Sequence, residues 1–171
     1  MPTPLVFVIA LGVLIVESVA LELLSIQSWT LQTPLVLAIY LGLDRDFVAG
    51  GLVLGGLLFP VEWLVGGVYG AYSLGLVVVF LALRGLRPRL QSVWGVARGV
   101  VAAVAALVHA GVMMVALFLI GEAGSRVSAA VVWQLGMSAV VVAVAAVIMG
   151  KGFARVDAMM DPRSDAVQLD R

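Results

Sequence analysis

Several residue types that build other classes of protein are scarce in this sequence. It contains no cysteine, which excludes a disulfide framework, a thiolate metal site and a cysteine nucleophile. Charged side chains make up only 12% of the 171 residues, about half the share found in an ordinary soluble domain. Basic and acidic residues balance at ten each, so no excess of positive charge favours nucleic acid binding. The chain therefore lacks the surface chemistry of a soluble or nucleic-acid-binding protein.

Hydrophobic residues are abundant instead, at 63% of the chain, and the mean hydropathy is +1.18. A soluble protein of this length needs a polar surface, which so few charged side chains cannot supply. A lipid bilayer removes that need, and about 20 mostly apolar residues cross it as a helix. We therefore expect an all-α integral membrane protein with six transmembrane helices in a compact bundle. No basic residue precedes the first apolar run, so we expect this run to remain as the first span.

The second expected span is short and ends at the charged triplet Asp44-Arg45-Asp46. A single helix through this triplet would place three charges inside the membrane, at a cost of roughly 2.5–3.5 kcal/mol each. A tight hairpin that leaves the triplet among the headgroups costs less. We predict a transmembrane domain over residues 1–155 and a cytoplasmic tail over 156–171, with spans at about 4–24, 31–43, 47–63, 68–84, 96–120 and 127–150.

The distribution of basic residues predicts the orientation of the chain, because cytoplasmic loops are enriched in lysine and arginine. With the N-terminus inside, Arg126 is the only basic residue of the ten in an outer loop. The inner regions hold the others: Arg45, Arg84, Arg87, Arg89, Arg98, Lys151, Arg155, Arg163 and Arg171. We therefore expect both termini in the cytoplasm.

Four ionisable residues fall within the expected spans, where charge is costly and often functional. Glu22 and Glu62 lie near outer ends, where a carboxylate reaches water or headgroups. Glu17 lies deeper, so we expect a structural hydrogen bond, with a partner contact or proton handling as the alternatives. His109 has no second histidine with which to share a metal ion, so we interpret it as a packing residue.

Small residues recur at helical spacing in two of the spans, which predicts close helix packing. A glycine turn then follows the third span and allows a tight connection to the fourth. The packing residues are Gly50, Gly51, Gly55 and Gly56 in span three and Ala102, Ala106 and Ala110 in span five, and Gly66 and Gly70 lie in the turn.

The cluster Arg84, Arg87 and Arg89 is interpreted as a topology anchor that contacts anionic lipids. A docking role for a cytoplasmic partner is the alternative. The sequence shows no phosphate-binding glycine loop, nucleophile elbow or metal-ligand constellation. We therefore expect a protein that is not an enzyme and that takes no cofactor or metal ion.

The stretch from Thr33 to Leu90 begins with Thr33-Pro34 and an apolar segment that ends in Tyr40-Leu41, and the charged triplet follows. This order of features resembles that of the MreD family of rod shape-determining proteins. A glycine-rich span follows with Glu62, where the family usually has aspartate, and the motif closes with Arg84, Arg87 and Arg89. Val68 stands where the family usually has proline. The similarity covers about a third of the chain.

This resemblance implies a fold like that of the substrate-binding S components of energy-coupling-factor vitamin transporters. It also implies a non-catalytic scaffold of the bacterial cell-wall elongation complex, which binds MreC and supports rod shape. RodA, MreB and the class B penicillin-binding protein would be partners in the wider complex, and no small-molecule ligand is expected.

A vitamin-binding S component is the alternative function. Such proteins commonly carry an Ala-xxx-Ala docking surface on the first span, but here Ala10 is followed at the fourth position by Leu14. A small enzyme that modifies or moves lipids is a third hypothesis, although the sequence offers no convergent polar residues for it.

Overall fold

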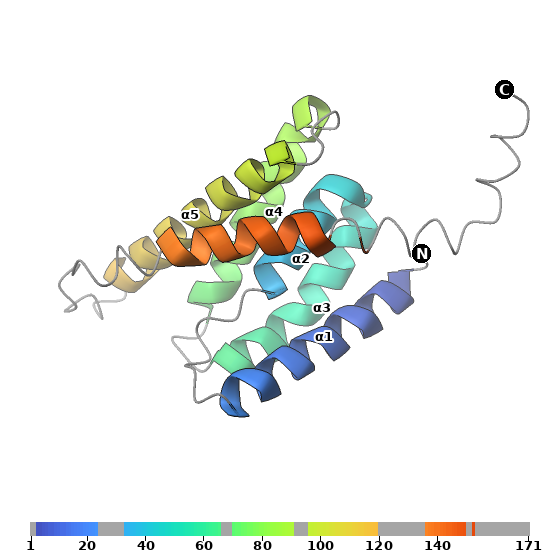
Figure 1. Cartoon of the computed structure of the whole chain (residues 1–171), viewed down its shortest axis with the longest axis vertical. Coiled ribbons are helices and arrows are strands. Elements are labelled where there is room, and N and C mark those ends of the chain that lie inside the picture. Colours follow the sequence, from blue (N-terminus) through green and yellow to red (C-terminus); the bar gives the residue numbers. More distant parts are fainter. Residues whose placement is uncertain are drawn as a thin grey trace, which may run out of the picture.

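The computed structural model describes residues 3–23, 33–65, 70–90, 96–119, 136–149 and 152. Within these residues the chain is all-helical, as the sequence predicts, and Figure 1 shows the helices gathered into one bundle. The six helices are α1 (Thr3–Leu23), α2 (Thr33–Asp44), α3 (Phe47–Val65), α4 (Ala71–Leu90), α5 (Val96–Leu119) and a further helix at Gly136–Met149.

Four of the helices are long and apolar enough to cross a membrane: α1, α3, α4 and α5. Their outward faces carry many exposed large hydrophobic side chains, among them Val16, Leu52, Phe59 and Phe118. Water would make such a surface aggregate, whereas lipid tails are as apolar as these side chains. The length and the surface of these helices therefore both suit a bilayer.

Helix α2 lies at the centre of the bundle (Figure 1), and most of its side chains are buried. Every residue from Pro34 to Gly42 is buried, and the helix contacts α1, α3, α4 and α5. Its 12 residues span about 18 Å at 1.5 Å per residue, which is shorter than a bilayer core of about 30 Å. The short apolar segment before the charged triplet is therefore an internal core helix surrounded by longer ones.

The longer helices pack around α2 in neighbouring pairs. Helices α1 and α3 run side by side, and α4 lies between α2 and α5 (Figure 1). The helix Gly136–Met149 packs on α5 at Gly99, where Val147 and Ala143 would lie within about 3.5 Å of an added Cβ atom. Successive helices α1 to α4 alternate in direction, so the ends of several helices meet at each end of the bundle.

Two helix boundaries differ from those expected, and parts of the expected spans lie outside the described residues. Helix α4 begins at Ala71 and continues to Leu90, past the expected end at Arg84 and through Pro88. The reason is that side chains of its last turns bind the end of α2, as described below. The segment 127–135 of the sixth expected span and the predicted tail at 156–171 are outside the described part.

Glycine allows the closest approaches to α2. A Cβ atom added at Gly42 would lie 3.2 Å from the Leu83 Cβ atom and 3.3 Å from the Phe80 carbonyl oxygen of α4. One at Gly50 would lie 3.2 Å from the Leu41 carbonyl oxygen. These two glycines therefore bring α3 and α4 close to the central helix.

The other predicted packing glycines have varied surroundings. A Cβ atom at Gly56 would lie 2.9 Å from the Phe7 ring of α1, whereas positions Gly51 and Gly55 have no atom within 4 Å. Gly70, before α4, has a φ of 92°, in the region that favours glycine. Gly66 is outside the described part of the chain.

The contrast between Gly42 and Gly51 gives a matched test. We expect Gly42→Ala to lower the free energy of unfolding by about 1 kcal/mol, because the new methyl group meets a backbone oxygen and a Cβ atom. Gly51→Ala fills open space within a helix and should raise stability by about 0.5–1 kcal/mol. Thermal unfolding of both variants in the same detergent measures the difference, and equal shifts would contradict the close α2–α4 packing.

Candidate functional site

The N-terminus of α2 is bound by a carboxylate from α1. The backbone N–H of Thr33 donates to both oxygens of Glu17, at 3.4 Å to Oε1 and 3.2 Å to Oε2. The first N–H groups of a helix have no partner within the helix, and the helix dipole makes this end electropositive. Glu17 therefore satisfies a free donor and complements the dipole of the central helix.

Helix α4 has the same arrangement at its own N-terminus. The backbone N–H of Ser73 donates to Oε1 of Glu62, on α3, at 2.6 Å. Glu62 is half-buried, and the residue after it, Trp63, is exposed. Two glutamates from the outer pair of helices thus cap two helices at the same end of the bundle, which we call the carboxylate end.

Tyr72 and His109 pack beside these two caps. Tyr72 is buried near both Glu17 and Glu62, and its electrostatic interactions include both carboxylates. The His109 ring, on α5, meets the Tyr72 ring edge-on, with centroids 4.7 Å apart. A notch at Gly75 receives the imidazole, since an added Cβ atom there would lie 2.6 Å from His109 Cδ2. His109 is therefore a packing residue of the α4–α5 interface.

The opposite end of α2 is bound by arginines. Arg84 and Arg87 of α4 donate through Nη1 to the carbonyl oxygen of Arg45, at 2.7 Å and 3.1 Å. Arg45 directly follows α2, so this carbonyl belongs to its electronegative C-terminal end. The central helix therefore has carboxylate at its N-terminus and guanidinium at its C-terminus, the two arrangements that its dipole favours.

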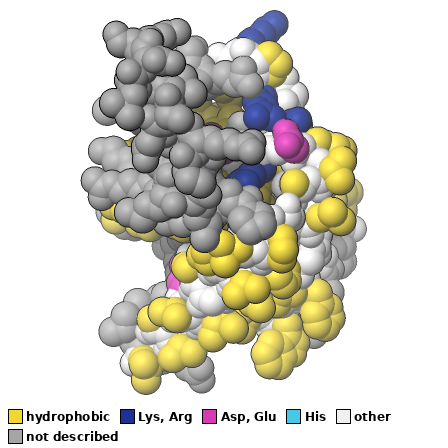
Figure 2. Space-filling view, turned by 90° about the vertical axis from the view of Figure 1, so that its right-hand side faces the viewer, with side chains coloured by type: hydrophobic (Ala, Val, Ile, Leu, Met, Phe, Trp, Pro, Cys, Tyr) yellow, Lys and Arg dark blue, Asp and Glu magenta, His cyan; other side chains and the backbone are white. Residues whose placement is uncertain are grey.

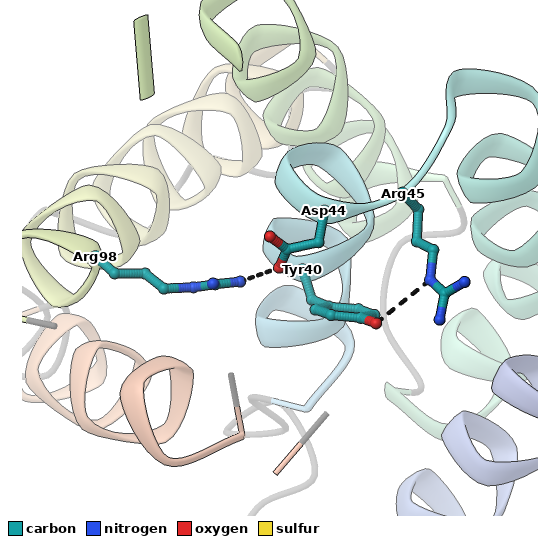
Figure 3. Close-up of polar contacts among 4 residues, drawn as sticks. All are labelled: Tyr40, Asp44, Arg45 and Arg98. Atoms are coloured by element: carbon teal, nitrogen blue, oxygen red, sulfur yellow. Dashed lines mark hydrogen bonds and ion pairs between the residues drawn. The ribbon is translucent and has the colours of Figure 1, made fainter. Parts of the chain in front are cut away.

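Two further polar contacts surround this arginine end of the bundle (Figure 3). Arg98, which comes from α5, forms an ion pair with Asp44 at the last residue of α2. On the other side of α2, Nε of Arg45 donates to the hydroxyl of Tyr40 at 3.3 Å, and its guanidinium lies 5.9 Å from the Tyr40 ring centre. Figure 2 shows basic side chains gathered at this end beside a largely hydrophobic surface.

The remaining predicted site residues lie on α1, α4 and α5. Ala102 and Ala106 are buried in the α5 interface, and Ala110 is half-buried. Arg89 is exposed on the last turn of α4, and Arg84 and Arg87 are the arginines of this helix that bind the Arg45 carbonyl. Glu22 is in the last turn of α1, and its side chain lies outside the described part of the chain. Among the described residues, no group of three or more acidic, histidine or cysteine side chains could hold a metal ion.

Several residues at the two ends of α2 were not identified from the sequence as site residues. Thr33 before Pro34 carries a local signal, because threonine followed by proline is typical of a helix start. Tyr72, Ser73 and Gly75 carry no such signal, since their roles depend on α1, α3 and α5. The ion pair between Asp44 and Arg98 also joins segments that are distant in the sequence.

Two hollows among the described residues are lined by apolar side chains. One lies between α4 and α5, and the second lies between α5 and the helix Gly136–Met149. The described carboxylates and guanidinium groups instead hold helix ends together. This arrangement suits binding of apolar groups and rigid support of the bundle.

No protein-family model, curated protein or solved structure matches this chain.

The cap on α2 predicts a graded loss of stability. Glu17→Leu should lower the free energy of unfolding by about 1–2 kcal/mol, because the Thr33 N–H loses its acceptor inside the bundle. Glu17→Gln keeps an acceptor oxygen without the charge, so about half of that loss is expected. Thermal unfolding in detergent measures the stability of both variants. The control is Val16→Ala, on the same helix at a position that is 69% exposed. A Glu17→Leu variant as stable as the control would contradict the cap.

The shared acceptor of Arg84 and Arg87 predicts non-additive substitutions. Either Arg84→Leu or Arg87→Leu leaves one guanidinium on the Arg45 carbonyl, so each should cost about 0.5 kcal/mol or less. The double variant strips the carbonyl of both donors and should cost about 1.5–3 kcal/mol. The measurement is unfolding in lipid-free detergent, with Arg89→Leu as the control. Simple additivity of the two single losses would show that the arginines act on separate acceptors.

Proposed function

We propose that this chain is a non-catalytic membrane scaffold of the MreD type, a subunit of the bacterial cell-wall elongation complex that binds MreC. The observation that carries this proposal is the position of the residues on which the resemblance rests. Pro34 and Tyr40 belong to the central helix, Arg45 follows it, and Glu62 and Arg84 are among the residues that cap α2 and α4. The motif is therefore one connected unit in space.

The proposed location is the bacterial inner membrane, with both termini in the cytoplasm. Four long apolar helices are consistent with a membrane protein. The arginine end of the bundle contains Arg45, Arg84, Arg87, Arg89 and Arg98, and positive charge favours the cytoplasmic face. The carboxylate end would then face outward.

The proposal that the protein is non-catalytic is supported by the use of its ionisable groups. Glu17 and Glu62 accept hydrogen bonds from helix N-termini, and Asp44 is paired with Arg98. A general acid or base must reach a substrate proton, but these carboxylates are bound to the protein itself. Their arrangement favours a structural role.

The S-component alternative receives less support from the structure. The positions on α1 that would match the transporter-docking surface are Ala10 and Leu14, and both are buried in the core at 3% and 1% exposure. The α4–α5 hollow and the hollow beside the helix Gly136–Met149 have apolar walls, whereas a vitamin pocket needs polar groups to orient its ligand. We therefore prefer the scaffold function.

Binding to MreC can be tested by co-purification. We expect the tagged chain, co-expressed with MreC from the same organism, to retain MreC through mild detergent at a fixed stoichiometry, because apolar helix faces such as that of Leu52 and Phe59 remain open to a single-span partner. A single-span protein of similar length with an unrelated sequence is the control. Native mass spectrometry of the purified complex gives the stoichiometry and detects any small ligand.

Two outcomes would contradict the proposal. One is loss of MreC when both proteins are monodisperse and folded. The other is a stoichiometric small molecule on the chain without MreC, which would favour the S-component function instead. The Glu17→Gln variant adds a check on the role of the caps, because it should still bind MreC whenever the bundle is folded.

A further inference from the structure

A continuous apolar groove runs between α4 and α5 on the surface of the bundle. It has a volume of about 210 Å³. Ala82 of α4 and Val104 of α5 line it and are both exposed. The lining residues are all aliphatic: Val79, Ala82, Leu83, Leu86 and Leu90 of α4, and Val100, Val101, Val104, Ala105 and Val108 of α5. The groove therefore suits an extended hydrocarbon chain.

The groove leads toward the arginine end of the bundle. On α4 its lining continues to Leu90, one residue beyond Arg89, and Arg89 shares a helix face with Leu86 and Ala82, at three and seven residues. On α5, Arg98 shares a face with Val101 and Ala105 at the same spacings. Hydrocarbon and cationic groups are thus aligned along the same two helices.

The charge at this end is unbalanced. Five arginines lie there with two aspartates, Asp44 and Asp46, which leaves an excess of three positive charges among the described residues; the arginines are Arg45, Arg84, Arg87, Arg89 and Arg98. The Nε atoms of Arg87 and Arg98 are buried without a hydrogen-bond partner among the described residues, while Arg87 donates through Nη1 to the Arg45 carbonyl and Arg98 is paired through Nη2 with Asp44. An anion is therefore the complementary occupant.

We propose that the α4–α5 groove binds an anionic phospholipid, with one acyl chain along the groove and the phosphate group at Arg89, beside the ion pair of Arg98 with Asp44. An apolar groove that ends in unbalanced positive charge fits the amphipathic shape of such a lipid. The headgroups of the cytoplasmic leaflet supply the negative charge. A neutral partner helix would fill the groove but would bring no anion to the exposed Arg89.

This site differs from a general contact between the arginine cluster and the membrane surface. Arg84 and Arg87 each donate to the Arg45 carbonyl, so their main role is to hold α2. Arg89 is exposed beside the groove and supplies the headgroup contact. The inference rests on the proposed membrane location and is independent of MreC binding.

Native mass spectrometry of the full chain provides the test. The protein in detergent is titrated with palmitoyl-oleoyl phosphatidylglycerol or with phosphatidylcholine of the same acyl chains. We expect one tightly retained phosphatidylglycerol and a preference over phosphatidylcholine of about fivefold or more, the factor for one basic side chain near a headgroup. Equal retention of the two lipids would overturn the proposal.

Variants separate the headgroup contact from the groove. Arg89→Ala should lower the retention of phosphatidylglycerol about fivefold without changing the retention of phosphatidylcholine. Arg89→Lys keeps the positive charge and should retain most of the phosphatidylglycerol bound by the wild type. Ala82→Phe combined with Val104→Phe fills the groove and should lower the retention of both lipids. The control is Val8→Phe, at a 62% exposed position on α1, which should leave the retention of both lipids unchanged.

Other occupants of the groove give distinct results. If the groove binds a second copy of the chain, the wild type is a dimer that the double phenylalanine variant dissociates, and the lipid proposal is overturned. Lipid retention that survives both the Arg89→Ala and the groove-filling variants, with each variant monodisperse, also overturns it. Carbonate extraction of the wild type from cell membranes checks insertion separately, so failure of the membrane location is distinguishable from failure of the lipid site.

Discussion

The architecture depends on capping a short helix that is buried within other helices. Helix α2 has no access to water along Pro34–Gly42, yet it leaves unpaired N–H groups at one end and carbonyl groups at the other. In an apolar interior each unsatisfied group is costly. Glu17 accepts from Thr33, and Arg84 and Arg87 donate to the Arg45 carbonyl. This requirement explains why a chain so poor in charge keeps ionisable residues at these positions.

Much of the helical organisation follows from the sequence, whereas the pairing of helix ends does not. Apolar length locates α1, α3 and α5, and the cost of the charged triplet locates the end of α2, because both are local properties. The contact between Glu17 and Thr33 joins residues 16 apart, and that between Arg84 and Arg45 joins residues 39 apart. Such contacts depend on which helices become neighbours. The extension of α4 to Leu90 also depends on a neighbouring helix, because Arg87 near its end donates to the Arg45 carbonyl after α2.

Glycine positions show the same limit of sequence reasoning. Small-residue spacing in α3 marks a smooth face but gives no information about what meets it. The structure places Gly50 against α2 and Gly56 against Phe7, while Gly51 and Gly55 have no close neighbours. Gly42 and Gly75 were not among the glycines predicted to pack. Gly42 nevertheless lies against α4, and Gly75 lies against His109, at distances as short as those at Gly50 and Gly56. Close packing here is set by the partner surface as much as by the glycine spacing.

The residues that carry the resemblance to MreD are largely the same residues that build and cap the central helix. A motif of this kind contributes to the fold, because Glu62 caps α4 and Arg84 and Arg87 together bind the C-terminal end of α2. Proteins that share the fold but differ in function would have to keep it. Their differences must then lie on outward surfaces, where no capping requirement acts. In this chain those surfaces are the apolar faces of the long helices and the α4–α5 groove beside Arg89, so they should distinguish a scaffold from a transporter subunit.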